Sequence, residues 1–300
     1  MKKLLNIIND LGWRGQIVSI DHLNDLRIAI LSRLEQGQIN RKLYQEQLSF
    51  FSFDPPSDLP GVRSILIVAV PTPQMRIFFQ SQGKRVPVMI PPTYVSYTPR
   101  TNRTQDALAD LLKKEGYHLA KTQLPLKTLA VRSGLAKYGR NNICYVDGMG
   151  SFIQLVGAFS DLPCDKDHWQ QPIMLDRCES CTACLRNCPT KAIRTDRFLL
   201  YAEKCLTFYN EAKSDFPGWI DPSWHHCLIG CMKCQKVCPE NKAVIKWFED
   251  RAEFSELETT LLIKSVPFEQ LPEEMVLKIK SLEINENYYS LCRNLKLLFN

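Results

Sequence analysis

Long apolar runs and membrane or export signals are what this sequence most clearly lacks. No stretch reaches the ~18 consecutive apolar residues of a membrane-spanning helix. Asn6, Asn9 and Asp10 interrupt the apolar run after the basic start, whereas a signal peptide needs about 7–15 unbroken apolar residues. The start has no twin-arginine pair either. These absences predict a cytoplasmic protein that has no membrane partner.

Glycine is scarce, with 13 residues in 300, and two glycine-dependent nucleotide motifs are missing. The sequence has no G-x-G-x-x-G run after a strand, the pattern that binds dinucleotides, and no Walker loop. The composition excludes wholesale disorder, because 45% of the residues are hydrophobic and 23% are charged. A globular chain of this length can form one large domain or two smaller ones.

Cysteine, by contrast, is abundant, with 12 residues in the chain. Nine of them lie between Cys178 and Cys238. Disulfides are rare in cytoplasmic proteins, where clustered cysteines are more often metal ligands or catalytic groups. The three others, Cys144, Cys164 and Cys292, have apolar or mixed neighbours, and we expect them to be small buried hydrophobic residues.

The first cysteine group has the C-x2-C-x2-C-x3-C-P spacing of bacterial ferredoxins. It consists of Cys178, Cys181, Cys184 and Cys188, followed by Pro189. Two-residue gaps let a tight loop direct three sulfurs to one [4Fe–4S] cube, while the fourth cysteine reaches a second cluster. Zinc is the alternative, but zinc sites usually combine two separated C-x2-C pairs. The spacing therefore predicts an iron–sulfur protein.

The second group, with the spacing C-x2-C-x3-C-P, is one cysteine short of the full motif. It contains Cys231, Cys234 and Cys238, and either Cys205 or Cys227 can supply the missing ligand. The crossed ferredoxin pattern then predicts two clusters. The ligands of the first are Cys178, Cys181, Cys184 and Cys238. The ligands of the second are Cys188, Cys231, Cys234 and one of the two upstream cysteines.

The residues before the cysteines have a mixed α/β pattern. Apolar residues at helical spacing predict helices at 2–11 and 21–36, and a third helix is expected at 102–115 with Thr104 as its capping residue. We expect an α/β domain, a ferredoxin-like module with two clusters and a short helical tail. Their expected ranges are 1–176, 177–240 and 241–300.

Strands are expected at three places in the same region. The continuous apolar run at 64–70 predicts a strand that is covered on both faces. Strands at 143–146 and 151–160 are expected to be joined by a hairpin turn at 147–150. The proline-rich residues 71–99 are expected to be irregular.

Positive charge is concentrated in residues 76–140. This basic band holds twelve Lys and Arg against three Asp and Glu, a net charge of +9, whereas the whole chain is +6. The residues after Glu240 are slightly acidic, with eight basic and ten acidic side chains. A basic band is either an ordinary solvated surface or a contact for an anionic ligand or partner, and the sequence leaves both open.

A segment with two glycines lies at the end of the basic band, ahead of the cysteines. Residues 132–142 read RSGLAKYGRNN, and their backbone N–H groups and Asn amides could hold phosphate or amide groups; a plain loop turn is the alternative. With the two cysteine groups about 35 residues later, this segment resembles the epoxyqueuosine reductase family, which belongs with the reductive dehalogenases. The family's own segment reads approximately A-G-L-G-x-x-G-K-N-T. The resemblance covers roughly residues 60–240.

The resemblance implies a cofactor besides the clusters. Members of the family bind base-off cobalamin in an α/β domain similar to nitroreductases, and one cluster lies near the corrin and feeds it electrons. The protein would position and tune the cofactor, which supplies the difficult chemistry. The run K-C-L-T-F at 204–208 is similar to the family's R-C-I-S-Y, which favours Cys205 as the eighth cluster ligand. The candidate cobalamin contacts are Gly134, Gly139, Arg140, Asn141 and Asn142.

The sequence also departs from the family. Thr122 stands where the tRNA enzymes have a catalytic aspartate, three residues before a proline that matches Pro125, and threonine is a poor general acid. Residues 94–97 are only a loose counterpart of the family's Y-A-x-G-x-D-Y-H stretch. The 60 residues after Glu240 are too few for the family's helical repeats. For these reasons tRNA is not expected as a partner.

Three functions remain open. We expect a cytoplasmic iron–sulfur and cobalamin-dependent reductase of an unidentified substrate, with a small molecule or a corrinoid as its ligand. Because no nucleotide-binding motif is present, reduced ferredoxin or flavodoxin is expected to donate the electrons. One alternative is a non-enzymatic electron-transfer or corrinoid-binding protein. The second alternative is an epoxyqueuosine-tRNA reductase with a relocated acid.

Overall fold

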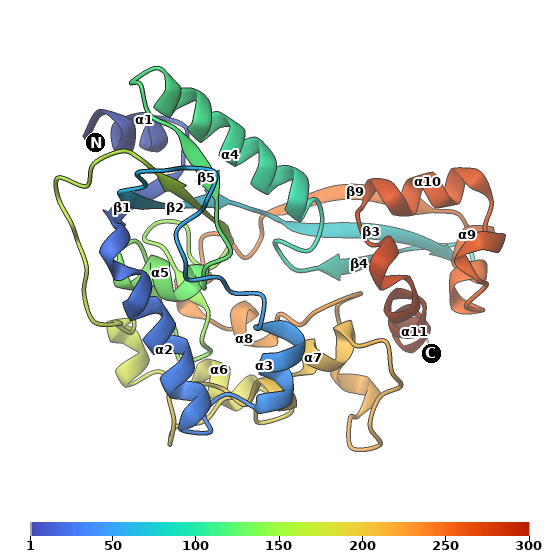
Figure 1. Cartoon of the computed structure of the whole chain (residues 1–300). Helices are drawn as coiled ribbons and strands as arrows, with labels where there is room; N and C mark the ends of the chain where they lie inside the picture. Colours follow the sequence, from blue (N-terminus) through green and yellow to red (C-terminus); the bar gives the residue numbers. More distant parts are fainter. Residues whose placement is uncertain (1, 300) are drawn as a thin grey trace.

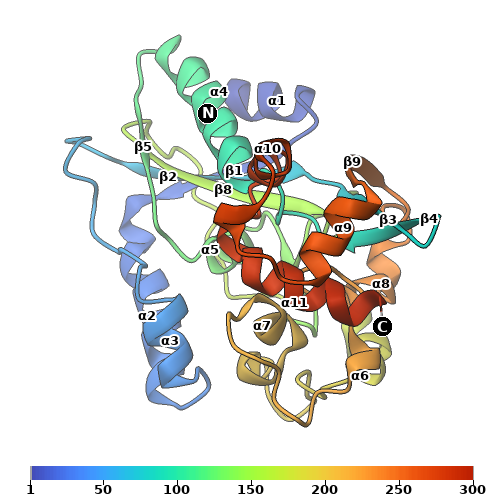
Figure 2. The ribbon, with the colours of Figure 1, turned by 90° about the vertical axis from the view of Figure 1, so that its right-hand side faces the viewer.

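The centre of the α/β region is a four-stranded antiparallel sheet in the order β1-β2-β8-β5. The computed structural model describes residues 2–299. The strands are β1 (Arg14–Ser19), β2 (Ser64–Pro71), β5 (Leu119–Lys121) and β8 (Ile153–Ser160). Two helices cover each face of this sheet (Figures 1 and 2). They are α1 (Lys2–Asp10) and α4 (Tyr97–Lys113) on one face, and α2 (Leu23–Glu35) and α5 (Leu126–Arg132) on the other.

Strand β2 is buried on both faces, as its continuous apolar run predicts. Ile65 and Ile67 pack into the core beneath α2 and α5, while Leu66 and Val68 pack into the core beneath α1 and α4. Successive side chains of a strand point to opposite faces, so one apolar run supplies both cores. The expected α/β layering and the first two expected helices are therefore confirmed.

A second, three-stranded sheet extends away from the first in the order β4-β3-β9 (Figure 1). Strands β3 (Gln74–Ser81) and β4 (Lys84–Ile90) form a hairpin within the range expected to be irregular, so that expectation was wrong. Its two turn residues, Gln82 and Gly83, both have positive φ, as a two-residue hairpin turn requires. Pro87 is tolerated because β4 is an edge strand, where a missing N–H breaks no ladder bond.

The residues after the cysteines contribute both a strand and helices. Strand β9 (Phe248–Phe254) pairs in parallel with β3. Phe254 of β9 stacks on Phe79 of β3 with ring centroids 5.1 Å apart, and both side chains are fully buried. The helical part of the tail packs on this sheet. Its helices are α9 (Glu256–Ile263), α10 (Glu273–Ser281) and α11 (Tyr288–Phe299).

Two local expectations were also wrong. The residues around 147–150 do turn, but only a single bridge, between Val146 and Gly150, closes the turn. The flanking strands separate: β7 (Cys144–Tyr145) pairs with β6 (Lys137–Tyr138), whereas β8 joins the large sheet. Thr104 lies inside α4, where its hydroxyl donates a hydrogen bond to the carbonyl of Arg100 at 2.8 Å. The helix begins at Tyr97, ahead of the expected start at residue 102, so residues 97–101 form its first turn.

The cysteine-rich residues form short helices and loops beneath both sheets (Figure 1). Among the described residues, no helix is both long and apolar enough to cross a membrane. The ranges 1–176, 177–240 and 241–300 stay a prediction as domain boundaries. The short helices of this region are α6 (Ala183–Asn187), α7 (Leu206–Glu211) and α8 (Lys233–Lys236). Another short helix, α3 (Arg41–Gln47), follows α2.

The stacked phenylalanines allow a test of how firmly β9 is held. Phe254→Ala is expected to lower the free energy of unfolding by about 3–5 kcal/mol, because it leaves a cavity against Phe79. Urea unfolding followed by circular dichroism measures this loss. Leu257→Ala, at an exposed position of α9, is the control and should stay within about 0.5 kcal/mol of the parent. Equal losses in the two variants would contradict the packing described here.

Candidate metal centres

Both cysteine groups fold the same way locally. The first has Cys184 on α6, and the second has Cys234 on α8. The two short helices pack against each other, so the two cysteine groups face one another. All twelve cysteines, which lie within the described residues, are free thiols. Disulfides therefore do not explain the clustering.

The first set of cysteines gathers around one cavity. This set is Cys178, Cys181, Cys184 and Cys238, and all four line the cavity. Burial, followed by the nearby thiols of Cys178, Cys238 and Cys181, raises the pKa of Cys184 to about 11. Cys238 comes from the other group, 50 or more residues along the chain from its partners. The arrangement favours the crossed ferredoxin pattern, although the ligand assignment stays a prediction.

The second set is Cys188, Cys205, Cys231 and Cys234. Burial and then the nearby thiols of Cys205, Cys227 and Cys188 raise the pKa of Cys231 to about 12. Cys231 and Cys205 also act on Cys234, whose pKa is raised well above its ordinary value mainly by burial. Burial raises the pKa of Cys205 too, with a smaller contribution from Cys188.

Cys227, the alternative ligand, is fully buried in a small apolar cluster with Phe152 and Met232. Burial raises the pKa of its thiol to about 11, and Cys231 is the one cysteine of the second set on whose pKa Cys227 acts. Cys205, by contrast, lies close to three cysteines of the second set. This favours Cys205 as the eighth ligand.

The chemistry of the donor set fits iron–sulfur clusters. Buried thiols that crowd one another resist ionisation, because each thiolate would repel the next in a medium of low dielectric constant. A cationic cluster removes this penalty by binding the sulfurs as thiolates. Two sets of four sulfurs match two [4Fe–4S] clusters. The residues would then hold an electron-transfer centre of two adjacent clusters.

Asn141 connects the two sets through hydrogen bonds. Its side chain is buried, and its amide donates to the hydroxyl oxygen of Tyr145 at 2.9 Å. Tyr145 in turn donates to the sulfur of Cys238, which belongs to the first set. The Asn141 amide also hydrogen-bonds Cys234 of the second set. Donors of this kind stabilise thiolate ligands and tune the cluster that they hold.

Gly139 and Arg140 approach the first set directly. Both line its cavity together with Asn141. A Cβ on Gly139 would lie 2.5 Å from a ring carbon of Tyr145 and 2.6 Å from the side-chain oxygen of Asn141, so only glycine leaves room for both. Arg140 donates a hydrogen bond to the carbonyl of Cys178.

Asn142 and Gly134 have other neighbours. Asn142 adopts a left-handed backbone, with φ at +57°. Its amide donates to the carbonyl of Phe198 at 2.7 Å, and its side-chain oxygen accepts from the N–H of Leu200. Asn142 thus fixes the loop between Cys188 and Cys205. Gly134 is exposed and lies near the side chain of Gln170.

Thr122 directly follows β5 and precedes the first cysteine of the two sets by more than 50 residues in the sequence. Its hydroxyl oxygen is buried and has no hydrogen-bond partner among the described residues. Its methyl group lies close to Gly157 of β8, where a Cβ would approach it to 2.9 Å. The position therefore holds a half-buried polar group without a partner in residues 2–299.

Sequence reasoning gave no role to three residues around the two cysteine sets, which are Tyr145, Tyr94 and Glu211. Tyr145 follows Cys144 without any motif, and only pairing between β6 and β7 brings it to Cys238. Tyr94 is half-buried and donates a hydrogen bond to Glu211. Burial of its hydroxyl first, then Glu211, Cys205 and Cys227, raise the pKa of Tyr94 well above its ordinary value.

Residues 177–241 match a family model described as a 4Fe-4S double cluster binding domain. Curated relatives include the epoxyqueuosine reductase of Cellulophaga algicola, 32% identical over 117 residues, which make up 39% of this chain and 37% of the relative. The epoxyqueuosine reductase of Bacillus cereus is 26% identical over 256 residues, covering 77% of this chain and 63% of the relative. The chain spans about a third of the length of the first such relatives.

Solved structures show the same fold over nearly the whole chain. A structure of epoxyqueuosine reductase from Bacillus subtilis, with its catalytic aspartate loop swung out of the active site, has a TM-score of 0.69 and 20% identity over 99% of this chain and 80% of that one. An epoxyqueuosine reductase with an epoxyqueuosine-modified tRNA stem loop has a TM-score of 0.71 and 19% identity, with the same coverage. The chain thus shares the fold of these epoxyqueuosine reductases and contains a segment that matches a double-cluster domain.

The hydroxyl of Tyr145 provides one test of the site. Tyr145→Phe is expected to lower the midpoint potential of the first-set cluster by up to about 40 mV. The reduced cluster carries more negative charge than the oxidised cluster, so losing a hydrogen bond worth about 1 kcal/mol disfavours the reduced state. A redox titration monitored by electron paramagnetic resonance measures the shift. Tyr138→Phe is the control, since that hydroxyl meets Thr128 and not a cysteine. An equal shift in both variants would argue against the hydrogen bond to Cys238.

Iron analysis separates the two candidates for the eighth ligand. Reconstituted protein should hold about eight irons per chain, and Cys205→Ala should reduce this to about four, because the second cluster loses a ligand. Cys227→Ala should retain about eight, with both cluster signals intact. The reverse outcome would assign the ligand to Cys227.

Proposed function

We propose that this chain is an iron–sulfur reductase that acts on epoxyqueuosine in tRNA. The observation that carries the proposal is the convergence of two cysteine sets on adjacent sites, joined by Asn141, in a chain with the fold of epoxyqueuosine reductases. Two clusters would deliver single electrons, and the α/β region beside them would bind the substrate. Reduced ferredoxin or flavodoxin would supply the electrons.

The likeness to a relative with a modified tRNA stem loop favours tRNA over an unrelated substrate.

The positive charge of the basic band also bears on whether the chain can bind tRNA. Arg76 and Arg85 of the basic band are paired with Asp250 and Glu253 of β9, at 2.6 and 2.9 Å. Other lysines of the band are exposed and have no ion-pair partner within residues 2–299, and such groups can bind phosphates. Lys113, Lys114 and Lys121 are examples.

Cobalamin belongs to the same proposal, on the strength of the resemblance. When bound, it would supply a strong reductant that transfers electrons to the substrate. The asparagine side chains predicted to contact cobalamin fit that role poorly, because their amides already bond to protein groups. Asn141 hydrogen-bonds Tyr145 and Cys234, and Asn142 hydrogen-bonds the carbonyl of Phe198. Only Arg140 keeps a buried nitrogen, Nε, without a partner. We therefore derive no step through cobalamin, and these residues stay a prediction as its contacts.

A second function is favoured by Thr122. A reductase that opens an epoxide needs a proton donor, and the Thr122 hydroxyl does not titrate near neutral pH. A protein that keeps both clusters without this acid could pass electrons to a partner and perform no turnover. This electron-transfer function differs from the reductase in one measurable property, which is conversion of the modified tRNA.

Substitution of Thr122 tests the reductase directly. Reconstituted protein with a chemical reductant and cobalamin is expected to convert an epoxyqueuosine-containing tRNA stem loop slowly. Thr122→Asp is expected to raise the rate by about 10²–10⁴-fold, because a half-buried carboxyl can remain protonated near neutral pH and act as a general acid. Mass spectrometry of the digested RNA measures the conversion.

Thr122→Asn is the matched control, because it has the shape of aspartate without a proton to donate, and it should not raise the rate. No binding of the stem loop at low salt would overturn the tRNA proposal. Binding without conversion by either the parent or Thr122→Asp would favour the electron-transfer function.

A further inference from the structure

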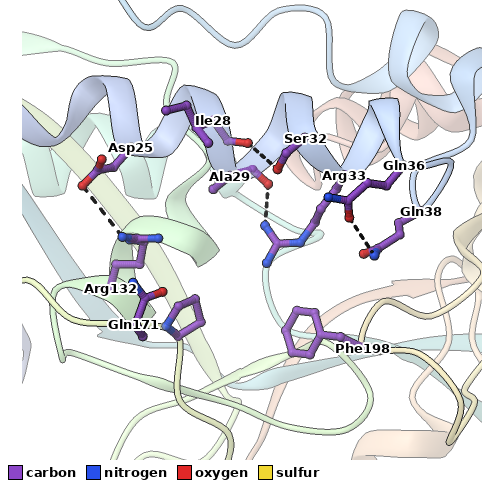
Figure 3. A pocket seen from close by; sticks show the side chains of 11 residues that line it. Asp25, Ile28, Ala29, Ser32, Arg33, Gln36, Gln38, Arg132, Gln171 and Phe198 are labelled. Atoms are coloured by element: carbon purple, nitrogen blue, oxygen red, sulfur yellow. Dashed lines mark hydrogen bonds and ion pairs between the residues drawn. The ribbon is translucent and has the colours of Figure 1, made fainter.

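A cavity lined by none of the candidate cluster or cobalamin residues lies between α2 and the end of α5. Its volume is about 420 Å³, which lies within the range of small-molecule sites. Residues 171–172 and Phe198 close it on the side opposite α2 (Figure 3). Its polar lining is Asp25, Ser32, Arg33, Gln36, Gln38, Arg132 and Gln171.

Arg132 keeps a buried side-chain nitrogen that has no hydrogen-bond partner among the described residues. Its side chain is 14% exposed, yet its guanidinium donates no hydrogen bond to any of the described residues, and its Nε is buried without a partner. One face of the group rests on the Trp169 ring, 4.9 Å from the ring centroid. A largely buried cation with unused donors is unfavourable unless an acceptor arrives from outside the protein.

Asp25 does not fill this need. Its nearest oxygen is 3.8 Å from Arg132, too far for a hydrogen bond. That carboxylate already accepts from the indole N–H of Trp169 at 2.7 Å and contacts His22 at 3.3 Å. The Asp25 charge is thus shared among three groups, and the Arg132 donors stay available.

Arg33 of α2 supplies a second guanidinium. It donates to the carbonyl of Ala29 in its own helix and lies over the Phe198 ring, 5.6 Å from the centroid. Figure 3 shows Arg33 and Arg132 on opposite sides of the same space. Two guanidinium groups present several donors in planar forks, an arrangement that suits the oxygens of a phosphate.

The rest of the lining suits a flat polar ring. The side-chain amides of Gln36, Gln38 and Gln171 offer both donors and acceptors, and Phe198 adds an aromatic surface. Gln36 and Gln38 bond to each other at 3.1 Å, which leaves their other amide atoms for a ligand. A heterocyclic base presents the same mixture of donors, acceptors and apolar faces.

The walls of the cavity are fixed in place. The backbone N–H of Gln170 bonds to the carbonyl of Arg132 at 2.9 Å, and its side chain bonds to the carbonyl of Val131 at 3.3 Å. These bonds tie the loop before Gln171 to the end of α5. Asn142 holds the carbonyl of Phe198. A ligand would therefore meet a preformed site, which reduces the entropy lost on binding.

We propose that this cavity binds a mononucleotide, with the phosphate between Arg33 and Arg132 and the base among Phe198 and the glutamines. The shared chemistry is a phosphate ester attached to a flat heterocycle. It can come from a free nucleotide or from the nucleotide portion of a corrinoid. The proposal does not depend on reductase activity, because binding is measured without turnover.

Calorimetric titration of reconstituted protein with AMP tests the site, with adenosine and inorganic phosphate as partial probes. AMP is expected to bind at least tenfold more tightly than either probe. Arg132→Gln and Arg33→Gln are each expected to weaken AMP binding by about 10–100-fold, because each removes charge-assisted hydrogen bonds to the phosphate. Cobalamin and cobinamide, the corrinoid without the nucleotide, then compete against bound AMP. Displacement by cobalamin alone identifies the corrinoid nucleotide, and displacement by neither identifies a free nucleotide.

Lys127→Gln is the matched control. It removes a positive charge from an exposed position on the same helix, α5, and AMP binding should be unchanged. Visible absorbance of the clusters and thermal unfolding verify that each variant is folded. Equal affinities for AMP and adenosine, an equal loss in Lys127→Gln, or no AMP binding by the folded parent would overturn the proposal.

Discussion

Mutual repulsion among buried thiolates is the constraint on which the cysteine-rich region of this structure depends. Burial and neighbouring thiols raise the pKa values of Cys184 and Cys231 to about 11 and 12. Without a cation these groups stay protonated, and with a cluster they ionise and bind. Folding has to assemble two such sets side by side from a segment that contains only short helices. The module therefore needs support from outside itself.

That support comes from the α/β region, through the residues between α5 and β8. Asn141 and Tyr145 reach the cysteine sulfurs, while Asn142 fixes the loop near Phe198. On the other side, the buried Asn241 accepts from the backbone N–H of Ser151 at 2.8 Å and donates to the carbonyl of Gln235 at 3.0 Å. The sheet with its helices thus acts as a frame for the clusters.

The tail changes how the charge pattern is interpreted. Residues after Glu240 are acidic overall, and β9 places Asp250 and Glu253 against arginines of the basic band. Part of the band's positive charge is therefore paired within the protein, through ion pairs that join β3 and β4 to β9. Surface ion pairs of this kind add little stability by themselves, but they reduce the positive charge that an anionic partner would meet. Sequence counting alone could not separate paired from unpaired cations, because the partners are about 170 residues apart.

Spacing and periodicity by themselves determined the chemistry and the core of this protein. The intervals between Cys178 and Cys188 specify cluster geometry through local loop lengths, and the apolar run of β2 specifies a strand between two helical layers, since both signals are short-range. Only the tertiary structure decided that residues 74–90 form a hairpin, that β9 completes its sheet and that Tyr145 meets Cys238. It also decided that Arg132 faces a cavity in which none of the described residues accepts a hydrogen bond from it. Each of these depends on contacts between distant segments, where pairing partners and burial are set by the packing of the whole chain.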